Sequence, residues 1–124
     1  MAKKMVEISV STDGGKLAIT IDPDPVQVQS GVQPKTHIVW KIASNGWEFS
    51  QDESDPPIST GITIKNPSPK GVFANEHGLD DQGNSSKKHH RWKIRATNNT
   101  QYNYTISMTN GTNTITLDPT IMND

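Results

Sequence analysis

Apolar and polar residues alternate at every second position over most of the chain, a period typical of β-strands with one buried face. The alternating apolar positions are Val6, Ile8 and Val10; Leu17, Ile19 and Ile21; Val26 and Val28; Ile38, Trp40 and Ile42; Trp47 and Phe49; Ile62 and Ile64; Trp92, Ile94 and Ala96; Tyr102, Tyr104, Ile106 and Met108; and Ile115 and Leu117. No segment of ten or more residues keeps the i, i+3, i+4 spacing of a helix. The pattern therefore predicts an all-β protein of seven to nine short strands.

Turn residues separate these strands. "STDGG" at 11–15 and "TNGTN" at 109–113 are hairpin signals, and "DPDP" at 22–25 ends a strand because proline has no N–H to donate to a ladder. Trp40 and Trp92 each lie in mid-strand, so we expect both in the core. We predict a single domain over residues 1–124, an antiparallel β-sandwich of immunoglobulin-like or cupredoxin-like type with Greek-key connections.

Two segments do not follow the alternation. Residues 50–60 ("SQDESDPPIST") form an acidic, proline-interrupted loop, and residues 66–86 run for about twenty positions with little periodicity. A connection of that length in a compact domain is usually functional or mobile. We expect Phe73 to anchor the longer segment to the core, and we expect both loops to be working surfaces.

Composition narrows the class of protein. Hydrophobic residues make up only 31% of the chain, but the net charge of −1 is too small for the usual disordered composition. The absence of cysteine excludes disulfides, thiolate zinc sites, iron–sulfur clusters and cysteine nucleophiles. No signal peptide and no apolar run of about twenty residues is visible, so we expect a soluble cytoplasmic protein without a membrane partner.

Residues 87–95, "KKHHRWKIR", are the most basic stretch of the chain. If Trp92 and Ile94 face inward, the residues on the opposite, outer face are His89, Arg91, Lys93 and Arg95. Such a stripe would suit an anionic partner, either an acidic protein segment or nucleic-acid phosphates. The pI of about 6.4 lacks the overall basic footprint of nucleic-acid binders, so we expect no such binding and keep it as an alternative.

An acidic run offers a counterpart to this basic stripe. Its carboxylates are Glu48, Asp52, Glu53 and Asp55. The expectation is that the two charged segments meet across the sheet within one chain, or between two copies in a self-associating protein.

Histidines and carboxylates around the 66–86 segment raise the question of a metal site. The candidate ligands are Glu76, His77, Asp80, Asp81, His89 and His90. Adjacent residues of a strand point to opposite faces, so only His77, one of the histidine pair and a carboxylate could share an ion. A metal-binding protein or metal-dependent enzyme centred on His77 is therefore an alternative, and we predict no cofactor.

Motifs of catalysis do not occur. The chain has no G-x-S-x-G nucleophile motif and no phosphate-binding glycine loop. We therefore predict that the protein is not an enzyme.

The run "LAITIDPDPVQVQSGVQPKTHIVWKI" at 17–42 resembles the opening of bacterial cupredoxin-like and immunoglobulin-like sandwiches, where a Val-x-Val strand, a glycine and a Trp-bearing strand follow in that order. The ending "YNYTISMTNGTNTITLDPTIMND" is similar to the last hairpin of small uncharacterised bacterial proteins of this shape. A blue-copper site needs a cysteine, so the resemblance implies the fold without copper electron transfer. The function we predict is a non-catalytic binding or protein-interaction module, whose partner is an unknown protein or a second copy.

Overall fold

The computed structural model describes residues 3–28, 36–54, 57–96 and 100–123. Within these ranges it contains strands and no helix, which confirms the all-β prediction. The strands are β1 (Lys3–Asp13), β2 (Lys16–Asp22), β3 (Val26–Val28), β4 (Thr36–Ile42), β5 (Glu48–Phe49), β6 (Ile62–Asn66), β7 (Phe73–Asn75), β8 (His89–Ile94), β9 (Thr100–Thr109), β10 (Thr114–Leu117) and β11 (Thr120–Asn123).

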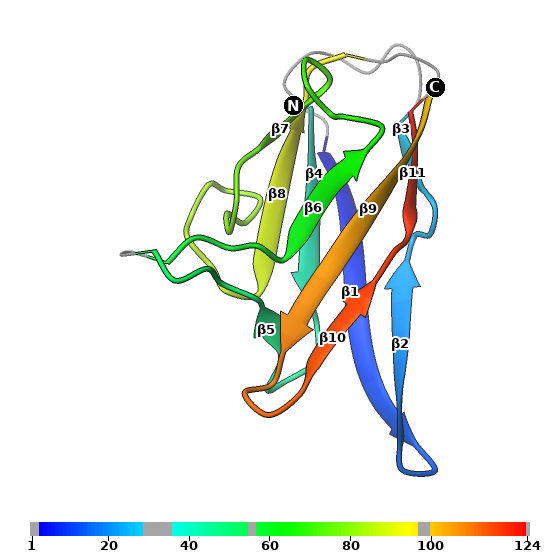
Figure 1. The fold of residues 1–124 in the computed structure, drawn as a ribbon, viewed down its shortest axis with the longest axis vertical. Helices are drawn as coiled ribbons and strands as arrows, with labels where there is room; N and C mark the ends of the chain where they lie inside the picture. The colour runs from blue at the N-terminus through cyan, green and yellow to red at the C-terminus, as the bar shows by residue number, and fades with distance from the viewer. Residues whose placement is uncertain (1–2, 29–35, 55–56, 97–99, 124) are drawn as a thin grey trace.

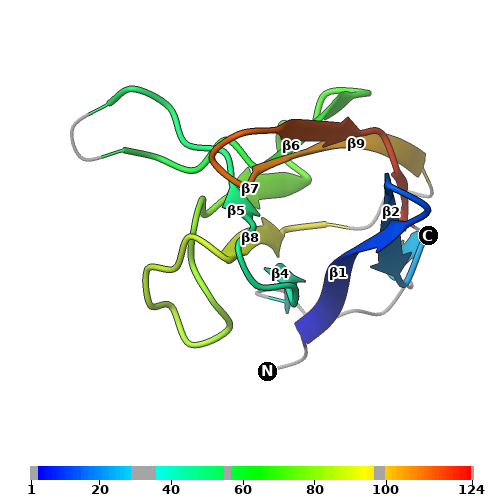
Figure 2. The same cartoon turned by 90° about the horizontal axis from the view of Figure 1, so that it is seen from below.

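The strands form two sheets that pack face to face as a sandwich (Figure 2). The first sheet has the order β2-β1-β4-β8-β7. The second has the order β10-β9-β11-β3, and β5 and β6 also pair with β9. The long strand β9 is thus the centre of the second sheet (Figure 1).

Both sheets are mixed, so the expectation of a purely antiparallel sandwich is wrong for two strand pairs. β1 pairs with β4 in parallel, and β3 pairs with β11 in parallel. In both cases the two paired strands are far apart in the chain, because the chain leaves one sheet for the other between them. Parallel neighbours require such a crossover, whereas a short hairpin always gives antiparallel neighbours.

Two of the eleven strands found in the described ranges, β7 and β11, are absent from the sequence prediction of seven to nine. β7 has three residues and lies inside the 66–86 segment, where it pairs with β8. β11 follows the "DP" dipeptide at 118–119 and lies beyond Leu117, the last apolar position of the predicted strands. Each of these strands has only one buried apolar residue, Phe73 in β7 and Ile121 in β11, so neither shows an alternation of apolar positions.

Hairpin turns lie where glycine signals predict them. Gly14 and Gly15 join β1 to β2 with φ values of 59° and 82°, the left-handed conformations of a type I′ turn. Between β9 and β10, Gly111 has a φ of 92°, and Asn110 Oδ1 accepts the backbone N–H groups of Thr112 and Asn113.

The core lies between the sheets and contains both predicted tryptophans. Trp40 is fully buried, and its Nε1 donates to the hydroxyl of Tyr104 at 3.1 Å. Trp92 Nε1 donates to the carbonyl of Ile62 at 3.0 Å, which connects β8 of one sheet to β6 of the other. Phe73 is also buried, edge-on to Tyr102 with ring centroids 5.0 Å apart. The expected anchor of the longer loop is therefore confirmed.

Candidate functional site

Residues 50–54 and 57–60 form a hairpin-like projection, the first arm. The backbone N–H of Asp52 donates to the carbonyl of Ile58 and that of Thr60 to Ser50, both at 2.8 Å. Asp52 Oδ1 also accepts the backbone N–H groups of Ile58 and Ser54, at 2.9 and 3.0 Å. These two hydrogen bonds, that from Ile58 first, lower the pKa of Asp52, because they stabilise the carboxylate form.

Residues 76–87 form a second arm built in the same way. Ser86 N–H donates to the carbonyl of Gly78 at 2.8 Å, and Asp80 N–H to the carbonyl of Asn84 at 2.9 Å. Asp80 Oδ1 closes the turn by accepting the N–H groups of Asn84 and Gln82. The bond from Asn84 is the main cause that lowers the pKa of Asp80. Both arms are therefore closed by an ionised aspartate that accepts backbone N–H groups.

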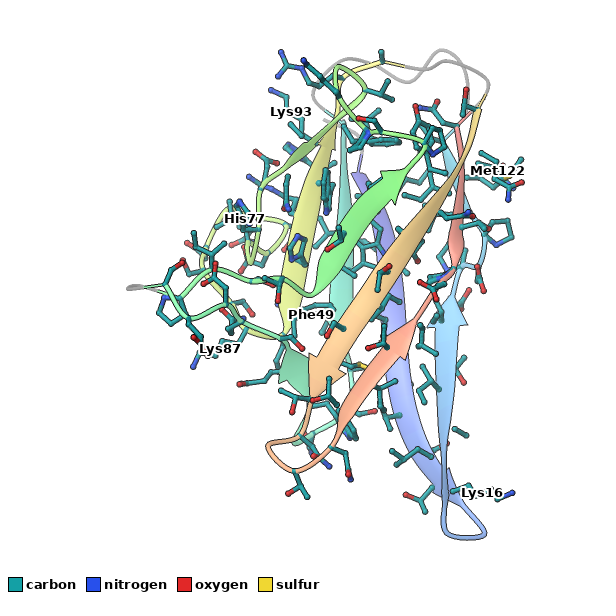
Figure 3. The ribbon with its side chains drawn as sticks, in the orientation of Figure 1. Lys16, Phe49, His77, Lys87, Lys93 and Met122 are labelled. Carbon is teal, nitrogen blue, oxygen red and sulfur yellow. The ribbon has the colours of Figure 1, made fainter. Side chains whose placement is uncertain are left out.

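The arms project from the same side of the sandwich, beyond β5 and β8 (Figure 1), and enclose a cavity of about 520 Å³ between them. They come together at Ser59 and Gly78, where a Cβ added to the glycine would lie 3.3 Å from the Cβ of Ser59. The residues that line the cavity are Gln51, Pro57, Ile58, Ser59, Glu76, His77, Gly78, Leu79, Ser85, Ser86 and Lys87. His77 and Lys87 both lie on this side of the molecule (Figure 3).

A buried polar network supports the base of the cavity. His90 is fully buried, with its Nδ1 2.8 Å from Ser59 Oγ and its Nε2 2.8 Å from Asn75 Oδ1. Asn75 Oδ1 also accepts the backbone N–H of His77 at 2.8 Å, which identifies this atom as the acceptor. His90 therefore carries its proton on Nε2, and its Nδ1 accepts the hydroxyl proton of Ser59. The network connects the first arm, β7 and β8.

Burial keeps the imidazole of His90 neutral. Desolvation, with a smaller contribution from His77, lowers the pKa of His90 to about 3. The ring stacks on Trp92 with centroids 6.5 Å apart and meets Phe49 edge-on at 6.1 Å. The side chain therefore acts as a neutral bridge between a hydroxyl and an amide.

The connectivity of hydroxyl, imidazole and amide also occurs in nucleophilic catalysis, where a base activates the hydroxyl and a third group orients the base. A general base works best with a pKa near the working pH, and a pKa of about 3 leaves His90 a weak proton acceptor. Ser59 is only 4% exposed, and its oxygen also accepts the N–H of Gly61 at 3.2 Å. The arrangement is thus suited to holding the arm in place.

The basic stripe has the predicted orientation. Along β8, His90, Trp92 and Ile94 are buried, while His89, Arg91 and Lys93 lie on the outer face. Arg95 follows the strand and is exposed. The stripe is not uniformly open to a partner, however, because the second arm lies over its first half.

The counterpart of the stripe is Glu76 of the second arm. Arg91 Nε donates to Glu76 Oε1 at 2.9 Å, and the Arg91 side chain is only 13% exposed. His37 Nδ1 also lies 2.8 Å from Glu76 Oε1, but the angles at the two atoms are not those of a hydrogen bond. The pairing of β7 with β8 explains this partner, because it continues into a hydrogen bond from Glu76 N–H to the carbonyl of Arg91.

The expected pairing with the 48–55 run does not occur in the parts of the chain that the structure describes; Asp55 lies outside them. His89 Nδ1 lies 2.7 Å from Ser86 Oγ of the second arm. For Lys93 and Arg95 no ion pair is found within the described ranges. The outward end of the stripe, marked by Lys93 in Figure 3, is therefore its accessible part.

Of the three histidines of the hypothetical metal site, His77 and His90 lie edge-on with ring centroids 6.2 Å apart, but the three do not converge on one point. His90 uses both ring nitrogens in the buried network, and His89 lies on the opposite face of β8. His77 has a φ of 52°, and its Nδ1 lies 3.4 Å from the carbonyl oxygen of Ser59. Over the described residues, no three metal-ligating side chains lie close enough to share an ion.

Sequence reasoning missed Ser59 and Asn75 as partners of His90. The available signal was His90 itself, because the alternation of β8 turns it inward and a buried imidazole requires hydrogen-bond partners. The identity of the partners was not available from that signal, since they lie 31 and 15 residues away in the chain.

Comparison with known proteins gives no relative: no protein-family model matches the chain, and no curated protein is similar in sequence. Within the described ranges, no helix has the length and apolar character that a membrane crossing requires. The function is therefore argued from the site alone.

Proposed function

We propose that the protein is a non-catalytic binding module and that its ligand occupies the cavity between the two arms. The observation that carries this proposal is the cavity of about 520 Å³, a size within the range of ligand sites, at about 300–1,000 Å³. Its walls are held by the Ser59–His90–Asn75 network, in which the polar side chains of Ser59 and His90 are buried at a cost in desolvation. We assign the fold as immunoglobulin-like or cupredoxin-like, supported by the two packed sheets and the central Trp40.

The lining of the cavity indicates a ligand with an apolar body and a carboxylate group. Pro57, Ile58 and Leu79 supply apolar surface, and Ile58 is 40% exposed. Lys87 is an exposed cation at the same cavity. Among the described lining residues, the one carboxylate is that of Glu76, and it is paired with Arg91. An anionic group of a ligand can therefore accept hydrogen bonds from the Lys87 ammonium, and Glu76 does not face it as an unpaired carboxylate.

Two sources can present this chemistry: a free small carboxylic acid, or an acidic side chain in an extended protein segment. The neutral, weakly basic imidazole of His90 favours binding over acyl transfer, because a hydroxyl activated by so weak a base remains a poor nucleophile. Binding without turnover is therefore the proposed activity.

A titration of the isotopically labelled protein followed by NMR tests the proposal. The probes are hexanoate against hexanamide, and a capped Leu-Asp-Leu peptide against its Leu-Asn-Leu analogue. We expect shift changes at Ile58 and Leu79 with one acid and weaker changes with its amide. Lys87→Glu should abolish them, and Lys70→Glu, an exposed lysine outside the cavity, should preserve them. A response to hexanoate alone would identify the ligand as a small carboxylic acid. A response to the Leu-Asp-Leu peptide alone would identify it as an acidic protein segment. The absence of shift changes with both acids, or shift changes in Lys87→Glu equal to those of the wild type, overturns the proposal.

A further inference from the structure

Strand β2 is an edge strand on the side of the molecule away from the arms (Figure 1). In the part of the chain that the structure describes, it pairs with β1 and with no other strand. Its seven residues contain no proline or glycine, and all but Ile19 and Ile21 are exposed. A long edge of this kind presents a row of unpaired N–H and C=O groups, which favours the addition of another strand.

The sequence of β2, "KLAITID", is complementary to itself when two copies run antiparallel about Ile19. In that register Lys16 of one copy lies opposite Asp22 of the other, Leu17 lies opposite Ile21, and Ala18 lies opposite Thr20. Each of these pairs then occurs twice, as a two-fold symmetric contact requires. Opposite charges directly across an antiparallel pair stabilise it, whereas like charges there destabilise it.

The two faces of β2 are consistent with this register. Ile19 and Ile21 pair with Val10 and Ile8 of β1 and are half-buried against the core. Leu17, on the same face, is 43% exposed and lies near the turn, beyond the well-covered part of the sandwich. A partner's Ile21 would cover this exposed leucine. Lys16 and Asp22 are exposed on the opposite face, where both can reach a partner strand.

We propose that β2 pairs antiparallel with β2 of a second copy of this chain, which joins the two five-stranded sheets into one. The occupant is a second copy because the register centred on Ile19 pairs the two strands over their full length and matches both the charge pairs and the apolar pairs. This surface is separate from the proposed cavity: Lys16 lies far from His77 and Lys87 (Figure 3). Both cavities of such a dimer remain open at its two ends.

Sedimentation velocity of the full chain at low to high micromolar concentration tests the dimer. We expect a dimer for the wild type and loss of the dimer in both Lys16→Glu and Asp22→Lys, because each variant places like charges opposite one another twice. When these two variants are mixed, each charge again faces an opposite charge, so a heterodimer should form. Lys70→Glu, a charge reversal away from β2, should leave the dimer unchanged.

Circular dichroism melts of each variant separate loss of pairing from loss of fold. The double variant Lys16→Glu/Asp22→Lys carries both reversals in the same chain, so opposite charges again face each other between the two copies. It should dimerise as the wild type does. A wild type that stays monomeric throughout the concentration range overturns the proposal. The proposal is also overturned if both single variants remain dimeric, or if the two single variants are folded but do not associate when mixed.

Discussion

The sandwich and the two arms are held by different forces. Between the sheets, the buried side chains are almost all apolar, and each strand contributes alternate residues to the core. In the arms, the chain path is fixed by carboxylates that accept backbone N–H groups and by the Ser59–His90–Asn75 network around the buried His90. The difference shows that where apolar alternation ends, hydrogen bonds to a few polar side chains can specify a conformation.

The two regions also respond differently to change. A well-packed apolar core loses stability in proportion to the volume removed, whatever the pH. A buried titratable group makes stability depend on pH, because the folded and unfolded states bind protons differently. Four predictions use this difference, beginning with the largest expected effect.

Trp40→Ala should lower the free energy of unfolding by about 3–5 kcal/mol. The substitution empties the centre of the core and leaves the buried hydroxyl of Tyr104 without its donor, 3.1 Å away in the wild type. Urea unfolding measures the loss. The matched arm variant is Ile58→Ala, whose side chain is 40% exposed, and it should change stability by no more than about 0.5 kcal/mol. Equal losses in the two variants would contradict the contrast between core and arm.

Acidification should destabilise the protein through His90. The unfolded chain takes up this proton as the pH falls below 6.5, whereas the folded chain resists protonation until about 3. The stability due to the neutral imidazole is therefore complete above pH 6.5 and is lost as the pH falls toward 3. The slope for one proton is about 1.4 kcal/mol per pH unit, so the loss reaches roughly 2–3 kcal/mol by about pH 4.5.

Urea unfolding at a series of pH values measures this loss in the wild type and in His90→Gln. The variant should show a flatter profile between pH 6.5 and about pH 4.5, and comparing the two proteins removes the carboxylate titrations that they share near the lower limit. His77→Gln, which alters an exposed histidine at the same cavity, should keep the wild-type slope. An unchanged slope in His90→Gln would show that another group controls the acid sensitivity.

Two glycines give a matched comparison of packing in the core and in the arms. A Cβ on Gly61 would overlap the Cβ and the ring of Phe49, so Gly61→Ala should cost about 1–3 kcal/mol by overpacking. A Cβ on Gly78 would lie 3.2 Å from the carbonyl oxygen of Ser86 and 3.3 Å from the Cβ of Ser59. Small shifts of the arms relieve such contacts, so Gly78→Ala should cost less. Thermal melts of the two variants measure the two losses of stability. A larger loss in Gly78→Ala than in Gly61→Ala would mean that the arms are the more rigid region.

How much of the fold follows from the sequence depends on how local the signal is. The alternation in β8 and β9 correctly places Trp92 inward and Arg91 outward, because the faces of a strand are set by neighbouring residues. The parallel pairing of β1 with β4 depends on where the chain crosses between sheets, and no local pattern encodes that crossing. β11 was missed because its inward residues are Ile121 and the polar Asn123, which give no apolar alternation.

The same distinction applies to the candidate site. His90 was expected to point inward, but Ser59 and Asn75 lie in segments without periodicity, and only the folded chain brings them to it. From the sequence, the acidic run at 48–55 was the expected counterpart of the basic stripe. Glu76 pairs with Arg91 instead, because β7 lies beside β8 and the chain leaves it next to that arginine.

The smallest predicted effect concerns the two neighbouring cations of the stripe, Arg91 and Lys93. From the sequence alone, reversing both charges should leave stability unchanged, but the structure separates them. Arg91 is 13% exposed and donates to Glu76, so Arg91→Glu places two carboxylates together and should cost about 1–2 kcal/mol. Lys93→Glu should stay within about 0.5 kcal/mol, as surface substitutions usually do. Urea unfolding in low salt and in high salt measures both losses. The loss in Arg91→Glu should shrink in high salt, since Glu76 is partly exposed and its repulsion is screened. Equal and negligible losses in the two variants would mean that the second arm is not held against the stripe by this ion pair.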